Sequence, residues 1–241
     1  MLVLAISRLT VAGETPPQRW LCPALAFVAG FVDAASFVQL GGVFCAHVTG
    51  NLVVVLTDLA QLHQPRWSSI ATVPVFLLAV VLVNRLARPR WNSAARARGI
   101  VLAFEATFIG LAMLLGALVG PSSRTATSAL VLMLLVVAMA AQSALHRMFP
   151  DLGPSSTVMT GNLAHWMLQR SEPARRRAQG SSGQPHMAAI ASFSFGCVLG
   201  AGLVKLFGLG ALSLPMCILF GGSYRTLGVV RAESRVASAS H

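Results

Sequence analysis

The chain has 241 residues, of which 55% are hydrophobic and only 10% are charged. A soluble domain of this length would carry about 25% charged residues, so the composition excludes a soluble globular protein. The formal net charge of +11 does not indicate a nucleic-acid partner. The arginines lie in short loops between apolar runs, where the positive-inside rule places them in membrane proteins. We therefore expect an integral membrane protein whose partner is the lipid bilayer.

Taken in chain order, the apolar runs predict an all-α polytopic membrane protein with about six transmembrane helices. A run of about 20 apolar residues is long enough to cross a bilayer as a helix. A leader occupies residues 1–19, and a single membrane domain follows at 20–222. We expect a disordered tail at 223–241. The predicted spans are at about residues 21–40, 69–86, 99–119, 127–145 and 187–206, with a sixth from about 209 to 220 or beyond.

Two polar breaks interrupt this pattern and repeat each other. Thr49-Gly50-Asn51 returns as Thr160-Gly161-Asn162, so the two copies are 111 positions apart (160 − 49). Each copy lies in an apolar segment and follows a hydrophobic run that carries one polar side chain, Asp33 in the first case and Gln142 in the second. A repeat at this distance is half the chain and predicts a duplicated unit.

The polar breaks are expected to be re-entrant segments rather than full spans. The second copy has about a dozen apolar-compatible residues, fewer than the ~17 that a crossing helix needs. If both segments crossed, the arginine-rich loops at 85–98 and 170–186 would face opposite sides, against the positive-inside rule. With re-entrant segments, each half (about 20–120 and 125–222) has three true spans. The halves then form an inverted-topology repeat, with the N- and C-termini in the cytoplasm.

This topology places the two triplets together. We expect each triplet to begin a half-helix near the bilayer midplane, with Thr49 and Asn51 capping free backbone N–H groups. Two helix N-termini meeting there would present positive partial charge. The sequence therefore favours a small neutral or anionic solute over a bare cation.

Several of these segments resemble the YoaK-type family of bacterial integral membrane proteins. In the first half the resemblance rests on residues 30–37, on 41–44 and on the first triplet. In the second half it rests on Gln142 and on residues 157–162. It covers roughly residues 20–222 and implies a multi-pass protein of the bacterial inner membrane with about six spans. It implies no particular activity.

Two functions remain open. One is a channel or secondary transporter for a small solute whose identity the sequence does not give. Its predicted pathway residues are Asp33, Thr49, Gly50, Asn51, Gln142, Thr160, Gly161 and Asn162. The other is a membrane scaffold or accessory subunit in which the triplets only lock helix packing.

The roles of the titratable side chains also stay open. His47 and His165 are candidates for a proton relay, although packed or hydrogen-bonded histidines are the commoner case. Asp33 either faces the pathway or locks a neighbouring helix. Glu105 is expected to pair with a loop arginine.

No motif of a nucleophilic or metal-dependent enzyme occurs, since GxSxG, HExxH and CxxC are all absent. We therefore expect no enzyme, no cofactor and no metal. Whether copies of the chain associate into a homo-oligomer is open.

Overall fold

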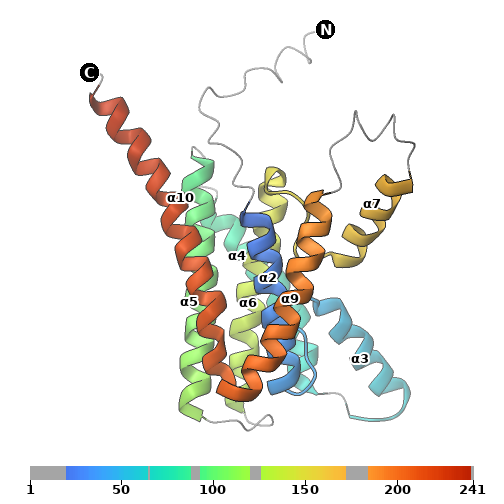
Figure 1. The fold of residues 1–241 in the computed structure, drawn as a ribbon. Coiled ribbons are helices and arrows are strands. Elements are labelled where there is room, and N and C mark those ends of the chain that lie inside the picture. Colours follow the sequence, from blue (N-terminus) through green and yellow to red (C-terminus); the bar gives the residue numbers. More distant parts are fainter. Residues whose placement is uncertain (1–19, 65, 88–92, 120–125, 172–183, 240–241) are drawn as a thin grey trace.

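The structure is a computed structural model that describes residues 20–64, 66–87, 93–119, 126–171 and 184–239. Every regular element in these segments is a helix (Figure 1). The predicted leader at 1–19 lies outside them, as does most of the second arginine-rich loop.

The elements follow one another as a series of long helices with two short ones between them. The long helices are α2 (Leu21–Gln39), α4 (Trp67–Ala87), α5 (Ala94–Val119), α6 (Ala126–Met148), α9 (Gln184–Phe207) and α10 (Ser213–Ala239). The short helices are α3 (Val48–Ala60) and α7 (Met159–Ser171), and two 3-10 turns are η2 (Pro150–Leu152) and η3 (Gly208–Leu212).

The long helices confirm a polytopic all-α membrane protein. Five segments of the described chain are long and apolar enough to cross a bilayer. The fifth, Pro185–Gly228, has 44 residues and contains most of α9, the turn η3 and the first part of α10. The last helix differs from its approximate predicted bounds. The last helix begins at Ser213 rather than near residue 209, and it continues to Ala239 where we expected a disordered tail.

The two short helices are re-entrant (Figure 1). We call the end of the bundle where α2 begins the upper end, as drawn in Figure 1, and the opposite end the lower end. Helix α2 runs down, the chain turns back to mid-height, and α3 returns to the lower end. Helix α6 runs up, the chain turns back in the same way, and α7 returns to the upper end. The halves are therefore inverted, as predicted.

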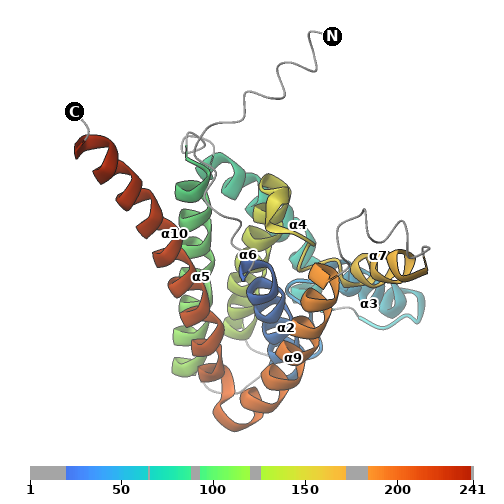
Figure 2. The ribbon, with the colours of Figure 1, turned by 45° about the horizontal axis from the view of Figure 1, so that its top comes forward.

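The two halves are also interlocked, because the main contacts between long helices join a helix of one half to a helix of the other. Helix α2 of the first half packs along α9 of the second, and α6 of the second half packs along α4 of the first. Helices α5 and α10, which end the two halves, pack against each other. Helices α3 and α7 lie together on one side of this bundle in both views (Figure 2).

The α2–α9 contact is a close approach of two backbones, which its glycines permit. A Cβ on Gly30 would overlap the carbonyl oxygen of Phe193, and a Cβ on Gly196 would overlap that of Phe27. Small residues at such a contact let membrane helices approach closely.

Glu105 differs from its prediction. It lies on α5, is fully buried, and neither of its carboxyl oxygens has a hydrogen-bond partner in the described structure. The nearby arginine Arg98 pairs instead with Asp151, with 2.5 Å between Nη2 and Oδ2. Sequence position placed Glu105 near its helix end but did not show that its side chain points inward.

Candidate functional site

We call each short helix together with the loop that precedes it a hairpin. Asp33 of α2 binds the loop of the first hairpin, which precedes α3. Its Oδ1 accepts hydrogen bonds from the backbone N–H groups of Cys45 (2.7 Å) and Ala46 (2.6 Å). Its Oδ2 lies 2.5 Å from Nδ1 of His47. Both carboxylate oxygens are thus used by the loop that precedes α3, which compensates for burying this charge.

In each half, the asparagine of the triplet binds the loop that precedes its short helix. The Asn51 side chain accepts a hydrogen bond from the N–H of Phe44 (2.9 Å) and donates one to the Phe44 carbonyl (2.7 Å). The Asn162 side chain donates to the carbonyl of Ser155 (2.8 Å). In each case the partner lies seven residues upstream. Both asparagines are buried, so each ties the re-entrant loop to its own half-helix.

This corrects the predicted capping role. Thr49 and Asn51 lie inside the first turn of α3, whose N-cap is His47, and no side chain caps that helix. The asparagine folds back onto the loop rather than onto the free N–H groups of the helix.

In the second half, two side chains of α6 take the place of Asp33. Gln142 donates hydrogen bonds to the carbonyl of Leu25 (2.9 Å) and to the Ser156 hydroxyl (2.6 Å). Nε2 of His146 accepts a bond from the N–H of Ser156 at 3.4 Å. Ser156 is the repeat equivalent of Cys45. Asp33 and Gln142, the polar side chains before the two triplets, therefore hydrogen-bond to equivalent residues of the two loops.

A positive φ at equivalent glycines completes the repeat. Gly42 has φ 82° and Gly153, 111 positions later (153 − 42), has φ 97°. Residues other than glycine rarely adopt a positive φ. At these two glycines the positive φ turns the chain back from the end of a long helix toward mid-height.

The two hairpins and two long helices surround one cavity of about 970 Å³. Thr49 and Thr160, one from each triplet, both line it. It extends to Asn84 and Arg147, which lie in the last turns of α4 and α6, at the upper end of the bundle (Figure 1). The cavity therefore leads from the upper end to the point where the inverted halves meet.

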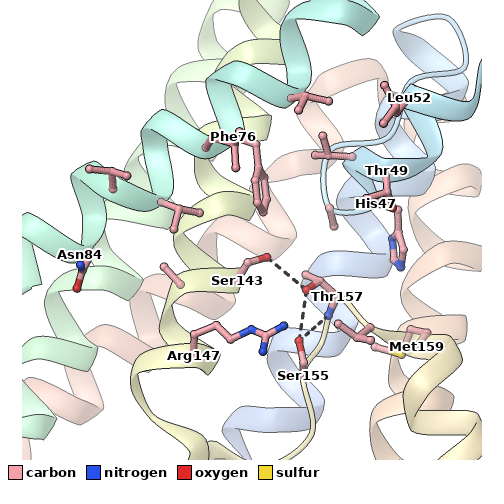
Figure 3. A pocket seen from close by; sticks show the side chains of 18 of the residues that line it. His47, Thr49, Leu52, Phe76, Asn84, Ser143, Arg147, Ser155, Thr157 and Met159 are labelled. Atoms are coloured by element: carbon pink, nitrogen blue, oxygen red, sulfur yellow. Dashed lines mark hydrogen bonds between the residues drawn. The ribbon is translucent and has the colours of Figure 1, made fainter. Parts of the chain in front are cut away.

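The walls of the cavity differ in chemistry. The α4 wall is almost wholly apolar and consists of Val73, Phe76, Leu77, Val80 and Val81. The facing wall, from α6 and the loop before α7, carries Ser143, Arg147, Ser155 and Thr157 (Figure 3). The Ser143 and Ser155 hydroxyls each lie 3.3 Å from the Thr157 hydroxyl.

Comparison with known proteins identifies the family. The family model described as protein of unknown function DUF1275 matches residues 21–224. The chain belongs to the DUF1275 family. This confirms the YoaK-type resemblance. No curated protein and no solved structure matches the chain.

In this DUF1275 chain, few of the predicted pathway residues line the cavity. Thr49 and Thr160 do, and His47 lines it as well. The remaining six predicted pathway residues are not among its lining residues; they are Asp33, Gly50, Asn51, Gln142, Gly161 and Asn162.

His47 and His165 lie in different surroundings. The His47 ring packs edge-on against Phe193, with 5.4 Å between centroids, and its Nδ1 is used by Asp33. His165 instead lies between α7 and α9, where its ring is 4.2 Å from that of His186 and its Nε2 is 2.9 Å from Gln169. Of these two histidines, only His47 lines the cavity.

Sequence reasoning missed Arg147. It reads as one more arginine at the cytoplasmic end of a span, yet it lies one turn beyond Ser143 on α6 and shares its cavity-facing side. That i, i+4 spacing is the signal that could have found it. Within the described segments, no three His, Cys, Asp or Glu side chains gather as metal ligands would.

Proposed function

We propose that this protein is a secondary transporter or channel for a small neutral or anionic solute, which occupies the cavity between the two hairpins. The main observation behind this proposal is that the triplet threonines of both inverted halves line one cavity that reaches one end of the bundle. Hydroxyl groups both donate and accept, so they can replace part of a solute's hydration shell. Inverted repeats of this kind place the solute site where the halves meet.

An asymmetry between equivalent helix pairs favours a transporter over an open channel. The pairs α2–α9 and α4–α6 correspond under the repeat. In the first pair, the backbones of α2 and α9 are in contact at Gly30 and Gly196. In the second pair, α4 and α6 are separated by the cavity at Asn84 and Arg147. If the two pairs exchange these arrangements, the cavity closes at the upper end and opens at the lower end, as alternating access requires.

The described charges support a cytoplasmic upper end in the bacterial inner membrane. Near the lower end lie Arg66, Lys205 and Asp58. Among the residues whose side chains the structure describes, the upper end carries one acid, Asp151, and the larger set of basic side chains Arg85, Arg96, Arg98, Arg147, Arg170 and Arg225. The positive-inside rule assigns such an end to the cytoplasm.

Solute flux into proteoliposomes tests the proposal. We expect at least one solute among glycerol, urea, chloride and acetate to enter faster than into protein-free vesicles. Thr160→Trp, which fills the cavity, should remove most of that flux. The matched control is Leu163→Trp on the same helix, since Leu163 is 49% exposed and does not line the cavity.

A non-transport scaffold is the second candidate, and the asparagine contacts favour it. Asn51 and Asn162 bind loop backbone rather than facing the cavity, which is what structural triplets would do. A scaffold predicts no flux above protein-free vesicles for any of the four solutes, with a protein that stays folded. Asn51→Ala should lower thermal stability under either function, so flux and not stability separates the two.

A further inference from the structure

Arg147 brings a charge to the cavity that no carboxylate of the described residues neutralises. Its side chain is exposed and extends from α6 toward Ser155 and Thr157 (Figure 3). The two ion pairs found among the described residues join other groups, Asp33 with His47 and Arg98 with Asp151. Arg147 therefore has no carboxylate partner in the described structure.

The rest of the cavity lining leaves this charge uncompensated. None of the described residues that line the cavity is an aspartate or a glutamate. The nearest buried acid behind the lining, Asp33, has both oxygens engaged by the first hairpin. An anion that enters the cavity would therefore be stabilised by the unpaired guanidinium of Arg147 through charge-assisted hydrogen bonds.

The opposite wall restricts which anion fits. Phe76 and the aliphatic side chains of α4 face the hydroxyls and the guanidinium across the cavity. A small inorganic ion would leave this apolar surface in contact with water. The volume of about 970 Å³ is at the upper end of the roughly 300–1,000 Å³ typical of organic-ligand pockets. The guanidinium fork of arginine matches a planar carboxylate with two parallel hydrogen bonds.

We propose that the cavity binds an organic carboxylate with an apolar body. Arg147 and the hydroxyls of Ser143 and Thr157 receive the carboxylate, and the α4 wall around Phe76 receives the hydrocarbon part. This inference rests on the proposed function for the role of the cavity and names the class of solute. The same chemistry is present in a water-soluble aromatic acid and in a fatty acid that enters from the bilayer.

Equilibrium binding of radiolabelled benzoate to the full-length protein in lipid nanodiscs tests the proposal. Benzoate should bind saturably. Acetate lacks the apolar body and benzyl alcohol lacks the charge, so each should compete at least about tenfold more weakly, because a charge-assisted bond and an apolar contact are each lost. Arg147→Gln should weaken benzoate binding about tenfold or more, and Arg147→Lys should weaken it less.

Two further variants make the result specific. Phe76→Ala should weaken benzoate binding while the protein stays folded. Arg85→Gln is the matched control, since Arg85 lies at the same end of the bundle, beside the lining residue Asn84, but does not line the cavity. It should bind benzoate as the unchanged protein does. Arg147 is exposed and makes no ion pair in the described structure, so its substitution should leave thermal stability unchanged.

The outcomes of the binding experiment distinguish support for the proposal from its rejection. Arg147-dependent binding of octanoate without binding of benzoate supports the proposal and assigns the ligand to the bilayer. Binding of neither acid, equal binding of benzyl alcohol, or unchanged binding in Arg147→Gln overturns it. Because binding is measured without flux, Arg147-dependent binding with no transport would reject the proposed function alone, whereas flux with no carboxylate binding would reject this inference alone.

Discussion

Asp33 illustrates what a buried charge does in this molecule. It accepts hydrogen bonds from two loop N–H groups and contacts His47, so it fixes the entry to α3 rather than facing the cavity. A sequence identifies a carboxylate in a span but not the side of the helix on which its partners lie. For the same reason Gln142 was predicted as a pathway residue, although its amide donates to Leu25 and Ser156.

We expect graded losses of stability at Asp33. Asp33→Asn keeps an oxygen for the two loop N–H groups and loses the contact with His47, at a cost of about 1 kcal/mol. Asp33→Ala leaves all three donors without an acceptor and should cost about 3 kcal/mol or more. Thermal unfolding of the purified protein in detergent should rank the unfolding temperatures as wild type, then Asp33→Asn, then Asp33→Ala.

Asp58 provides the control for this series. It lies on α3 and forms no ion pair within the described structure, so Asp58→Ala should unfold close to wild type. If Asp33→Ala unfolds at the wild-type temperature, the hairpin is held by other contacts and the role given to Asp33 is wrong.

At the scale of elements, the close helix contact was predictable and the cavity was not. Glycines at helical spacing indicate a close approach wherever the helix meets a neighbour, and the Gly196 face does meet α2. The sequence could not show that α9 is the partner of α2, because the two are far apart in the chain. Nor could it show that the equivalent pair α4–α6 separates at Arg147, since both pairs read as apolar helices.

Adding one methyl group to this contact should be disruptive. Gly196→Ala places a Cβ against the carbonyl of Phe27, so α2 and α9 must move apart at a cost of about 1–3 kcal/mol. Gly202→Ala on the same helix is the matched control, because a Cβ there meets nothing within 4 Å. Thermal unfolding should fall for the first variant only; equal unfolding temperatures would contradict the packing described for α2 and α9.

At the scale of the whole molecule, charge and length together were enough to predict the inverted, re-entrant topology. The second triplet segment is too short to cross, and the arginines have to share one side. The sequence could not give the extent of α10. Residues 223–239 carry arginines and small residues that read as a tail, yet they continue a helix that begins in the bundle.

Single-cysteine labelling tests this topology in intact bacterial cells. With the four native cysteines replaced by alanine, reporters at Ser93 and Ser171 should both resist an impermeant thiol reagent added outside. A reporter at Gln64, beyond the lower end of α3, should react. Ser93 directly precedes α5 and Ser171 ends α7, so opposite reactivity at these two positions would mean that α7 crosses the membrane.

The interlocked halves bear on how the protein is made. Helix α2 finds its main packing surface on α9, and a ribosome has synthesised most of the chain before α9 exists. Until then α2, with the buried charge of Asp33, waits in the membrane without the helix that covers it. Contacts between such distant segments form late and slowly. We therefore expect the α2–α9 contact to form only after most of the chain has been synthesised, so that α2 lacks its main packing partner through most of translation.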